Sequence, residues 1–348
     1  MRKHVSACQG SATLTMGSAV SPFGQSLART VAALTHLPRT TAIAYMHEIA
    51  LSVTGLNKSY GDFDVLKNLD LQIRRGSIHG LVGLNGSGKT TTLECILGLQ
   101  PYQDGAISVL GHAPDELHAA KGSVVGIFDT PSLHPYLSVR QCMQHARLLC
   151  DLPTRTPEQV ENLLGIERFS EFKIKHLSLG NKRRASIAQA LLGSPALIVL
   201  DEPFSGLDAD GVDDVLELIE TLNREEGTSF LLSSHQLPYL EQICSHIAIL
   251  HDGRIVVSDE TANLLSQTTT TVLIKTDQTK AAVAVIKALD SCELLQIDAD
   301  GYLHIELENL ESAALNQALI DQQIPVSELI LKRASLGSLF RKISSEVQ

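Results

Sequence analysis

Eight residues of the chain fit the pattern of a glycine-rich phosphate-binding loop. They are Gly83, Leu84, Asn85, Gly86, Ser87, Gly88, Lys89 and Thr90. An apolar run before them, Ile78 to Val82, predicts a strand, and the run from Thr90 to Leu99 predicts a helix. Glycines permit the positive φ angles that turn backbone N–H groups inward, while Lys89 can reach outer phosphates and Thr90 can offer a hydroxyl to Mg²⁺. Strand before and helix after favour a nucleotide phosphate cradle over a chance glycine-rich turn.

The predicted helix after the loop adds to the same anion site. Its first turn contains Thr91 and has unpaired backbone N–H groups, which point toward a bound anion. We therefore expect Gly83 to Thr91 to bind phosphates together.

Composition limits what else the chain can do. With 348 residues, of which 44% are hydrophobic, it can bury one substantial core and a smaller one, so two domains are expected. A formal net charge of -11 argues against sequence-independent binding to nucleic acid, because that binding depends on Lys and Arg contacts to phosphates. We therefore expect a small nucleotide as ligand and no nucleic-acid partner.

Cysteines and apolar runs bear on the location of the protein. The six cysteines form no CxxC pair and no repeated metal-ligand spacing, and no secretory signal precedes them, so we expect reduced thiols in the cytoplasm. No window approaches the run of about 18 apolar residues that a spanning helix needs. A role at a membrane would then require a partner chain.

Residues 1–47 differ from the rest of the sequence. They contain no Asp or Glu, include four Lys and Arg residues, and are rich in Ser, Thr and Ala. Three interpretations stay open: a disordered basic tail, an organellar transit peptide, and a start-site artefact in which translation begins at Met46.

Two patterns after residue 48 predict two kinds of sheet. Alternating apolar residues from Ile49 to Ile73, with a turn at Gly61 and Asp62, predict an antiparallel β layer. Later apolar runs are spaced by helical segments, which favours a largely parallel, covered sheet. These runs are Ile107 to Leu110, Val124 to Phe128, Leu197 to Leu200, Phe230 to Leu232, and Ile247 to Leu250.

The segment from Ser138 to Leu192 is predicted to be mostly helical, with a break at Pro153 and Pro157. One apolar helical face comprises Val139, Met143, Ala146 and Leu149. After the run Thr268 to Thr271, the order strand, helix, strand, strand, helix, strand, helix predicts a small α+β appendage. Its segments are Val272 to Lys275, Lys280 to Leu289, Leu294 to Asp298, Tyr302 to Leu307, Leu310 to Gln322, Val326 to Leu331, and Leu336 to Ser344.

A second apolar strand ends in two carboxylates. The run Ala196 to Leu200 leads directly into Asp201, Glu202 and Pro203. Acidic residues at the carboxyl end of such a strand face the ligand crevice, where Asp201 can hold Mg²⁺ and Glu202 can polarise an attacking water. The alternative is that both acids only cap the strand.

Further motifs stand in a fixed order around these two. They are Leu177-Ser178-Leu179-Gly180-Asn181, Ser205-Gly206-Leu207-Asp208, and His235 after Ser233-Ser234. With the phosphate loop and the acidic strand, they resemble the ATP-binding cassette (ABC) ATPases over roughly residues 49 to 265. The resemblance implies a P-loop α/β fold of the ABC type, with a mostly parallel sheet, an antiparallel β layer, a helical subdomain at about residues 130–192, and a separate α+β domain.

The resemblance also implies roles for individual residues. Glu202 and His235 would be catalytic, with His235 holding the γ-phosphate and the water. Ser178 and Gly180 would contact the γ-phosphate on the other subunit, with Asp208 in a loop that crosses the same interface. Purely structural alternatives stay open: Ser178 could be a helix N-cap, and His235 could have a structural role.

Tyr60 matches the aromatic residue that stacks on adenine in the family, although it could also be a hairpin aromatic that covers the core. Asp129 stands where the family usually has a Gln, and by resemblance it would join Thr90 and Asp201 as a metal ligand. The acid at this position and the Leu-Ser-Leu-Gly signature resemble the bacitracin and lantibiotic branch. The alternative is a one-residue shift in the alignment.

The resemblance predicts an ATP hydrolase that uses ATP and Mg²⁺. Residues 48–265 would form the ATPase domain and 266–348 an accessory domain. Two cassettes, identical or paralogous, would close on ATP and drive export through a separate membrane permease, which holds the protein at the inner face of the plasma membrane. The rival is a soluble ABC-type ATPase that acts on a macromolecular complex.

Overall fold

The computed structural model describes residues 48–129, 132–266, 270–289, 291–307, 311–332 and 335–346. The segment 1–47, for which a tail, a transit peptide and a start-site artefact stay open, lies outside the described residues. Part of the threonine run at 268–271 lies outside them as well.

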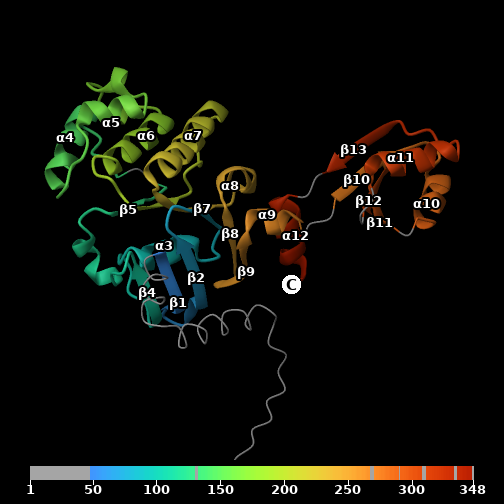
Figure 1. Ribbon diagram of the computed structural model, residues 1–348, viewed down its shortest axis with the longest axis horizontal. Coiled ribbons are helices and arrows are strands. Elements are labelled where there is room, and N and C mark those ends of the chain that lie inside the picture. The colour runs from blue at the N-terminus through green and yellow to red at the C-terminus, as the bar shows by residue number, and fades with distance from the viewer. Residues whose placement is uncertain are drawn as a thin grey trace, which may run out of the picture. The chain divides into compact units, whose positions relative to one another are not determined.

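A six-stranded sheet forms the centre of the structure (Figure 1). Its strand order is β5-β6-β7-β3-β8-β9. The strands are β5 (Val124–Ile127), β6 (Leu197–Asp201), β7 (Ser229–Ser234), β3 (Ile78–Val82), β8 (His246–His251) and β9 (Arg254–Glu260). The first five are parallel, and β9 pairs antiparallel with β8. Every residue of β3, β6 and β7 is buried, which explains why these strands read as continuous apolar runs.

An antiparallel sheet of three strands, in the order β2-β1-β4, forms a second layer. Its strands are β1 (Ile49–Tyr60), β2 (Phe63–Arg74) and β4 (Asp104–Val109). The apolar run at Ile107 was expected in the parallel sheet, but β4 pairs antiparallel with β1, where Val53 faces Ile107. An apolar run does not specify which neighbour a strand pairs with, so this placement had to come from the fold.

Two hydrophobic cores cover the two faces of the central sheet. Neighbouring residues of β6 point to opposite faces, so Ile198 joins the core on the helical side while Leu197 joins the core beneath the antiparallel sheet. The second core includes α3 (Lys89–Ile96), and the first includes α7 (Ala209–Glu226) and α8 (Leu237–Ile243). The central sheet is therefore covered on both faces.

A group of helices follows β5 and lies at one end of this assembly, in green in Figure 1. They are α4 (Val139–Leu149), α5 (Pro157–Leu163) and α6 (Leu179–Ala190), with the short 3₁₀ turns η2 (Glu167–Phe169) and η3 (Ile174–His176); a longer one, η1 (Pro114–Ala120), precedes β5. Capping boxes at Ser138 and Thr156 begin α4 and α5. Pro157 is the first residue of α5, so it starts a helix, as proline at this position can.

The predicted apolar face of α4 is only partly buried. Val139 and Met143 belong to the core and Ala146 packs against it, whereas Leu149 is 74% exposed. Leu149 is the last residue of α4, so the predicted apolar face is buried at the start of the helix and exposed at its end.

The carboxyl-terminal segment forms a separate antiparallel sheet with the order β11-β12-β10-β13. Its elements are β10 (Thr270–Lys275), α10 (Thr279–Lys287), β11 (Cys292–Ile297), β12 (Tyr302–Leu307), α11 (Ser312–Asp321) and β13 (Glu328–Lys332). This order of elements is the predicted one and is that of a ferredoxin-like β-α-β-β-α-β unit. Residues from the sheet and both helices, among them Val272, Ile286 and Leu319, form its core.

The last helix, α12 (Leu336–Glu346), packs elsewhere. Leu336, Leu339 and Phe340 join the core that contains α8, and the Leu336 N–H donates to Glu241 Oε2 at 2.8 Å. Together with α9 (Thr261–Ser266), which contacts β9, α12 anchors both ends of the α+β segment to the part of the chain that contains the central sheet. The domain boundaries at 48–265 and 266–348 stay a prediction.

Among the described residues, no helix has both the length and the apolar character that crossing a membrane requires.

Candidate active site

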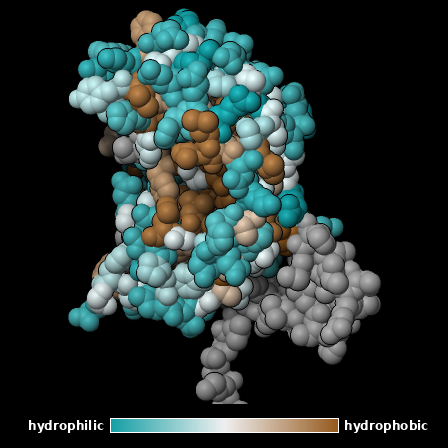
Figure 2. Space-filling model, turned by 90° about the vertical axis from the view of Figure 1, so that its left-hand side faces the viewer, coloured by the Kyte–Doolittle hydropathy of each residue, from teal (hydrophilic) through white to brown (hydrophobic). Residues whose placement is uncertain are grey.

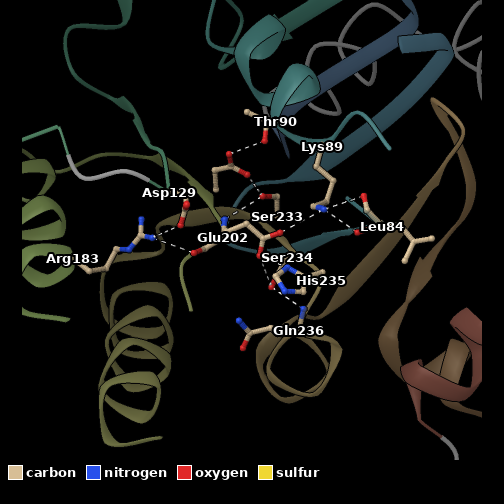
Figure 3. A network of polar contacts seen from close by, with 12 residues as sticks. Leu84, Lys89, Thr90, Asp129, Arg183, Glu202, Ser233, Ser234, His235 and Gln236 are labelled. Carbon is tan, nitrogen blue, oxygen red and sulfur yellow. Dashed lines mark hydrogen bonds and ion pairs between the residues drawn. The ribbon is translucent and has the colours of Figure 1, made fainter. Parts of the chain in front are cut away.

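Three adjacent strands bring the predicted motifs together. In the order β6-β7-β3, the carboxyl end of β6 carries Asp201, that of β7 carries Ser233 and Ser234, and β3 leads into the phosphate loop. Parallel strands place their carboxyl ends at one edge of a sheet, where open α/β folds bind ligands. Figure 3 shows Lys89, Ser233 and Ser234 converging at that edge.

The phosphate loop has the backbone that its glycines predict. Gly86 and Gly88 have φ angles of 82° and 106°, a region that other residues rarely occupy. At Gly83 a Cβ would lie 2.7 Å from the Leu250 carbonyl oxygen, so no larger residue fits there. The Ser87 hydroxyl is buried and has no hydrogen-bond partner among the described residues, as expected of a group placed for a polar ligand.

Lys89 begins α3, and its side chain folds back over the loop. The ammonium donates to the Gly83 carbonyl at 2.8 Å and lies 3.5 Å from Glu202 Oε1. Lys89 is buried, so its charge is poorly hydrated and is strongly felt by an anion in the cradle. The cation, the loop N–H groups and the start of α3 all favour phosphate at the same place.

Asp201 and Thr90 form a cluster of hard oxygen donors. The Thr90 hydroxyl donates to Asp201 Oδ2 at 2.9 Å, and the Ser233 hydroxyl donates to Asp201 Oδ1. Carboxylate and hydroxyl oxygens are ligands that Mg²⁺ prefers, and they lie beside the phosphate cradle. The residues present therefore fit Mg²⁺, which Thr90 and Asp201 would hold.

Glu202 and His235 face each other across the ends of β6 and β7. His235 Nδ1 lies 3.0 Å from Glu202 Oε2, and the Ser234 hydroxyl donates to the same oxygen at 3.2 Å. The Glu202 side chain is 15% exposed and that of His235 is 49% exposed, so the carboxylate is sheltered but can be reached by water. Glu202 has a φ of 47°, a strained value for a residue with a Cβ.

Asp129 lies at the edge of this network rather than among the Asp201 oxygens. Its Oδ1 accepts from Arg183 Nη2 at 3.1 Å, and its side chain is 55% exposed. The structure thus gives the carboxylate a cationic partner on α6. Its role as a metal ligand stays a prediction.

Tyr60, at the end of β1, is 46% exposed, and the Lys58 ammonium lies 4.4 Å from its ring centroid. The exposed position of the ring is compatible with stacking on a base. The adenine-stacking role and the alternative of a hairpin aromatic that covers the core both stay predictions.

The two loops that contain Ser178 and Asp208 lie at the starts of two helices, α6 and α7. The Ser178 hydroxyl caps α6 by accepting from the Asn181 N–H at 3.3 Å, and Asp208 caps α7 by accepting from the Gly211 N–H at 3.1 Å. The Leu179 side chain covers Gly206, where an added Cβ would lie 2.4 Å from Leu179 Cδ2.

No hydrogen bond or ion pair within the described part of the chain joins Ser178 or Gly180 to the phosphate loop. The cap roles are thus observed within one chain. The predicted contact with nucleotide concerns a second copy and stays a prediction.

Two groups of the network were not assigned from the sequence. Ser233 and Ser234 were noted only as the residues before His235, yet their hydroxyls orient both carboxylates. The sequence contains a signal for this role, because both pairs follow apolar runs: Ser233 and Ser234 end one predicted strand, and Asp201 and Glu202 end another. Arg183 was noted only as one of several basic residues in a helix, and nothing in the sequence separates it from Lys182 or Arg184.

Comparisons with known proteins agree with this geometry. Residues 66–205 match the ABC transporter family model. An uncharacterized ABC transporter ATP-binding protein, YdbJ of Bacillus subtilis, is 30% identical over 87% of this chain and 98% of its own length. The bacitracin transport ATP-binding protein BcrA of Bacillus licheniformis is 28% identical over 84% of this chain and 96% of its own. The lantibiotic transport ATP-binding protein SrtF of Streptococcus pyogenes is 31% identical over 60% of this chain and 90% of its own.

Solved structures show the same fold. An ATP-binding subunit of an ABC transporter has a TM-score of 0.57 and 30% identity over 63% of this chain and 92% of its own. The dimeric, post-hydrolysis cassette MJ0796, bound to ADP and Pi, has a TM-score of 0.56 at 24% identity over 61% of this chain and 98% of its own, a likeness of fold. The fold, the network at the strand ends and the relatives together place this chain in the family of ABC transporter ATP-binding proteins, which bind and hydrolyse ATP.

Proposed function

We propose that Glu202 activates the water that attacks the γ-phosphate and that His235 holds the carboxylate and the water in place. The observation that carries this proposal is the contact between Glu202 and His235 beside Lys89. Lys89 and the loop N–H groups bind the phosphates. Mg²⁺ held by Thr90 and Asp201 would neutralise phosphate charge.

The substitution Glu202→Gln tests this assignment. The amide keeps the shape of the side chain but cannot accept the proton, so we expect kcat to fall at least 100-fold while ATP binding stays within threefold. Turnover is measured by phosphate release and binding by the fluorescence of a labelled ATP analogue.

Glu158→Gln is the matched control because Glu158 is an exposed carboxylate paired with Arg140 in the helical region, away from the site. Its turnover should stay within twofold of the wild type. Wild-type turnover in Glu202→Gln would contradict the assignment of the base.

We also infer that two cassettes share the nucleotide. Each phosphate loop would face the Ser178 and Gly180 loop of the other copy, which begins α6 and so offers further N–H groups to phosphate. The exposed Leu179, where the family commonly has Gly, would lie near this contact.

The membrane partner would dock at an apolar hollow formed by β5, α4 and α6. The hollow has a volume of about 280 Å³, and its lining includes Gly126, Ala146, Leu149 and Ala190. Figure 2 shows apolar surface around a hollow on this side of the molecule. An amphipathic helix of a permease fits such a site, with its apolar face against the hollow.

The direction of transport that we propose is export. The relatives named above include transport proteins for bacitracin and for a lantibiotic. This kinship supports a transporter over a soluble ATPase that acts on a macromolecular complex. The chain would then work at the cytoplasmic face of the plasma membrane, attached through its permease.

A further inference from the structure

Arg183 is a charged residue in the interior of the protein. It belongs to α6, and only 1% of it is exposed. Its Nη1 donates to the Phe128 carbonyl at 2.8 Å, and its Nη2 donates to Asp129 Oδ1 at 3.1 Å and to the Glu202 carbonyl at 3.2 Å. One guanidinium therefore joins α6, the segment after β5 and the end of β6, as Figure 3 shows.

Burying the Arg183 charge costs free energy, and close packing alone does not require a charged residue at this position. Burial lowers the pKa of the Arg183 guanidinium, and the carboxylates of Asp129, Asp201 and Glu202 oppose that shift. The Nε group has no partner among the described residues, so the site does not satisfy the guanidinium completely. An apolar side chain would be cheaper at a purely structural position. Arg183 thus adds a positive charge beside three acids of the candidate site.

The contact with Glu202 falls on a strained peptide. The left-handed φ of 47° at Glu202 is unfavourable for a residue with a Cβ, so surrounding hydrogen bonds must hold it. The Glu202 N–H donates to the Ser233 carbonyl at 3.0 Å, and the Glu202 carbonyl accepts from the Ser205 N–H at 3.1 Å as well as from Arg183. Two side chains hold this peptide, because the Glu202 N–H also donates to the Ser233 hydroxyl at 3.3 Å. Ser233 belongs to the adjacent strand β7, whereas Arg183 comes from the helix α6.

We propose that Arg183 is a positioning residue for hydrolysis. Its guanidinium holds the Glu202 peptide and the Asp129 segment in a fixed relation, and its charge neutralises the carboxylate that stands where the family usually has a Gln. Because Arg183 lies on the helix that Ser178 begins, it also joins that loop to the catalytic carboxylate of the same chain. This inference rests on the proposed role of Glu202.

The test compares Arg183→Met with Arg184→Met. Arg184 is the next residue on α6, and its guanidinium pairs with Asp214 of α7 instead of the site. A small displacement of a catalytic group lowers the reaction rate strongly, so we expect Arg183→Met to lower kcat at least tenfold. The affinity for labelled ATP should stay within threefold, and Arg184→Met should keep kcat within threefold. Arg183→Lys keeps the charge and one donor and should recover part of the loss.

A kcat for Arg183→Met within threefold of the wild type would overturn the inference, as would an equal loss in Arg184→Met. If Arg183→Met is insoluble, Arg183→Gln takes its place, because the amide still donates to one carbonyl; wild-type turnover in that variant would also overturn the inference. Glu202→Gln, measured in parallel, separates the two proposals. An inactive Glu202→Gln beside active Arg183 variants would leave the catalytic base in place and remove only the positioning role.

Discussion

At the scale of single residues, buried ionisable groups carry most of the information about this protein. Lys89, Asp201 and Glu202 could be named from the sequence because each belongs to a motif with a chemical reason for its spacing. Arg183 could not, since a basic residue on a helix is usually solvated and only the fold shows that this one is enclosed. Arg183 also explains how the chain accommodates Asp129 where the family usually has Gln, because the guanidinium pairs with the added negative charge.

A second buried ionisable residue, His79, lies at the start of β3, at the end of that strand opposite the phosphate loop. Its ring stacks on His246 with centroids 4.6 Å apart, and its Nε2 has no hydrogen-bond partner among the described residues. Burial, with His246 and Arg74 nearby, lowers the pKa of His79 to about 3. The folded protein therefore keeps this ring neutral at a pH where the unfolded chain protonates it.

His79 should make the protein acid-sensitive. Below the ordinary histidine pKa of about 6.5, the unfolded state binds one more proton, so the free energy of unfolding falls by about 1.4 kcal/mol per pH unit until the folded pKa is reached. His79→Phe keeps a stacked ring but removes the titration. We expect its unfolding free energy to depend less on pH between 6 and 4, by about that slope.

Guanidinium unfolding at a series of pH values measures this difference. His145→Phe, at an exposed position of α4, is the control and should keep the wild-type slope. Equal slopes for His79→Phe and the wild type would refute the assignment.

At the scale of elements, the sequence predicted the type of most segments but not all of their partners. The alternation in residues 49–73 and the apolar runs at the phosphate loop gave the right strands because their burial patterns differ, half-buried in one and fully buried in the other. The pairing of β4 with β1 could not be predicted, since it depends on contacts between distant residues. The edge strand β9 was missed although Ile255, Val256 and Val257 form a short apolar run, because none of its residues is fully buried and it pairs on one side only.

The hollow between β5, α4 and α6 leads to a prediction at this scale. Ala190, on α6, is one of its small lining residues, and a carboxylate in its place would fill apolar space with charge. We expect Ala190→Glu to abolish co-purification with a co-expressed permease subunit while basal ATP hydrolysis stays within twofold.

Ala190→Ser, which changes little in size, is the control and should keep the complex. A complete complex with Ala190→Glu, at wild-type yield, would show that the permease does not use this hollow.

At the scale of the whole molecule, the predicted nucleotide-binding residues of one chain fall into two groups. The phosphate loop, Glu202 and His235 form one network, while Ser178 and Gly180 begin a helix with no hydrogen bond to that loop in the described residues. We propose that the additional N–H groups that would enclose a γ-phosphate come from a second copy. The charge of the γ-phosphate would hold the two copies together, and its loss would let them separate.

Light scattering of the Glu202→Gln protein with and without Mg²⁺ and ATP tests this arrangement. ATP should raise the mass from 37.6 kDa to about twice that value, because the bound nucleotide is not consumed. Adding Ser178→Asp should prevent the doubling. Aspartate is as good an N-cap as serine, so α6 is preserved, but its charge repels the γ-phosphate of the partner's nucleotide. A protein that binds ATP and stays monomeric would instead mean that Leu179, Asp129 and Asn181, which stands where the family commonly has Gln, weaken self-association. The second half of the site would then come from a paralogous cassette or form only on the permease.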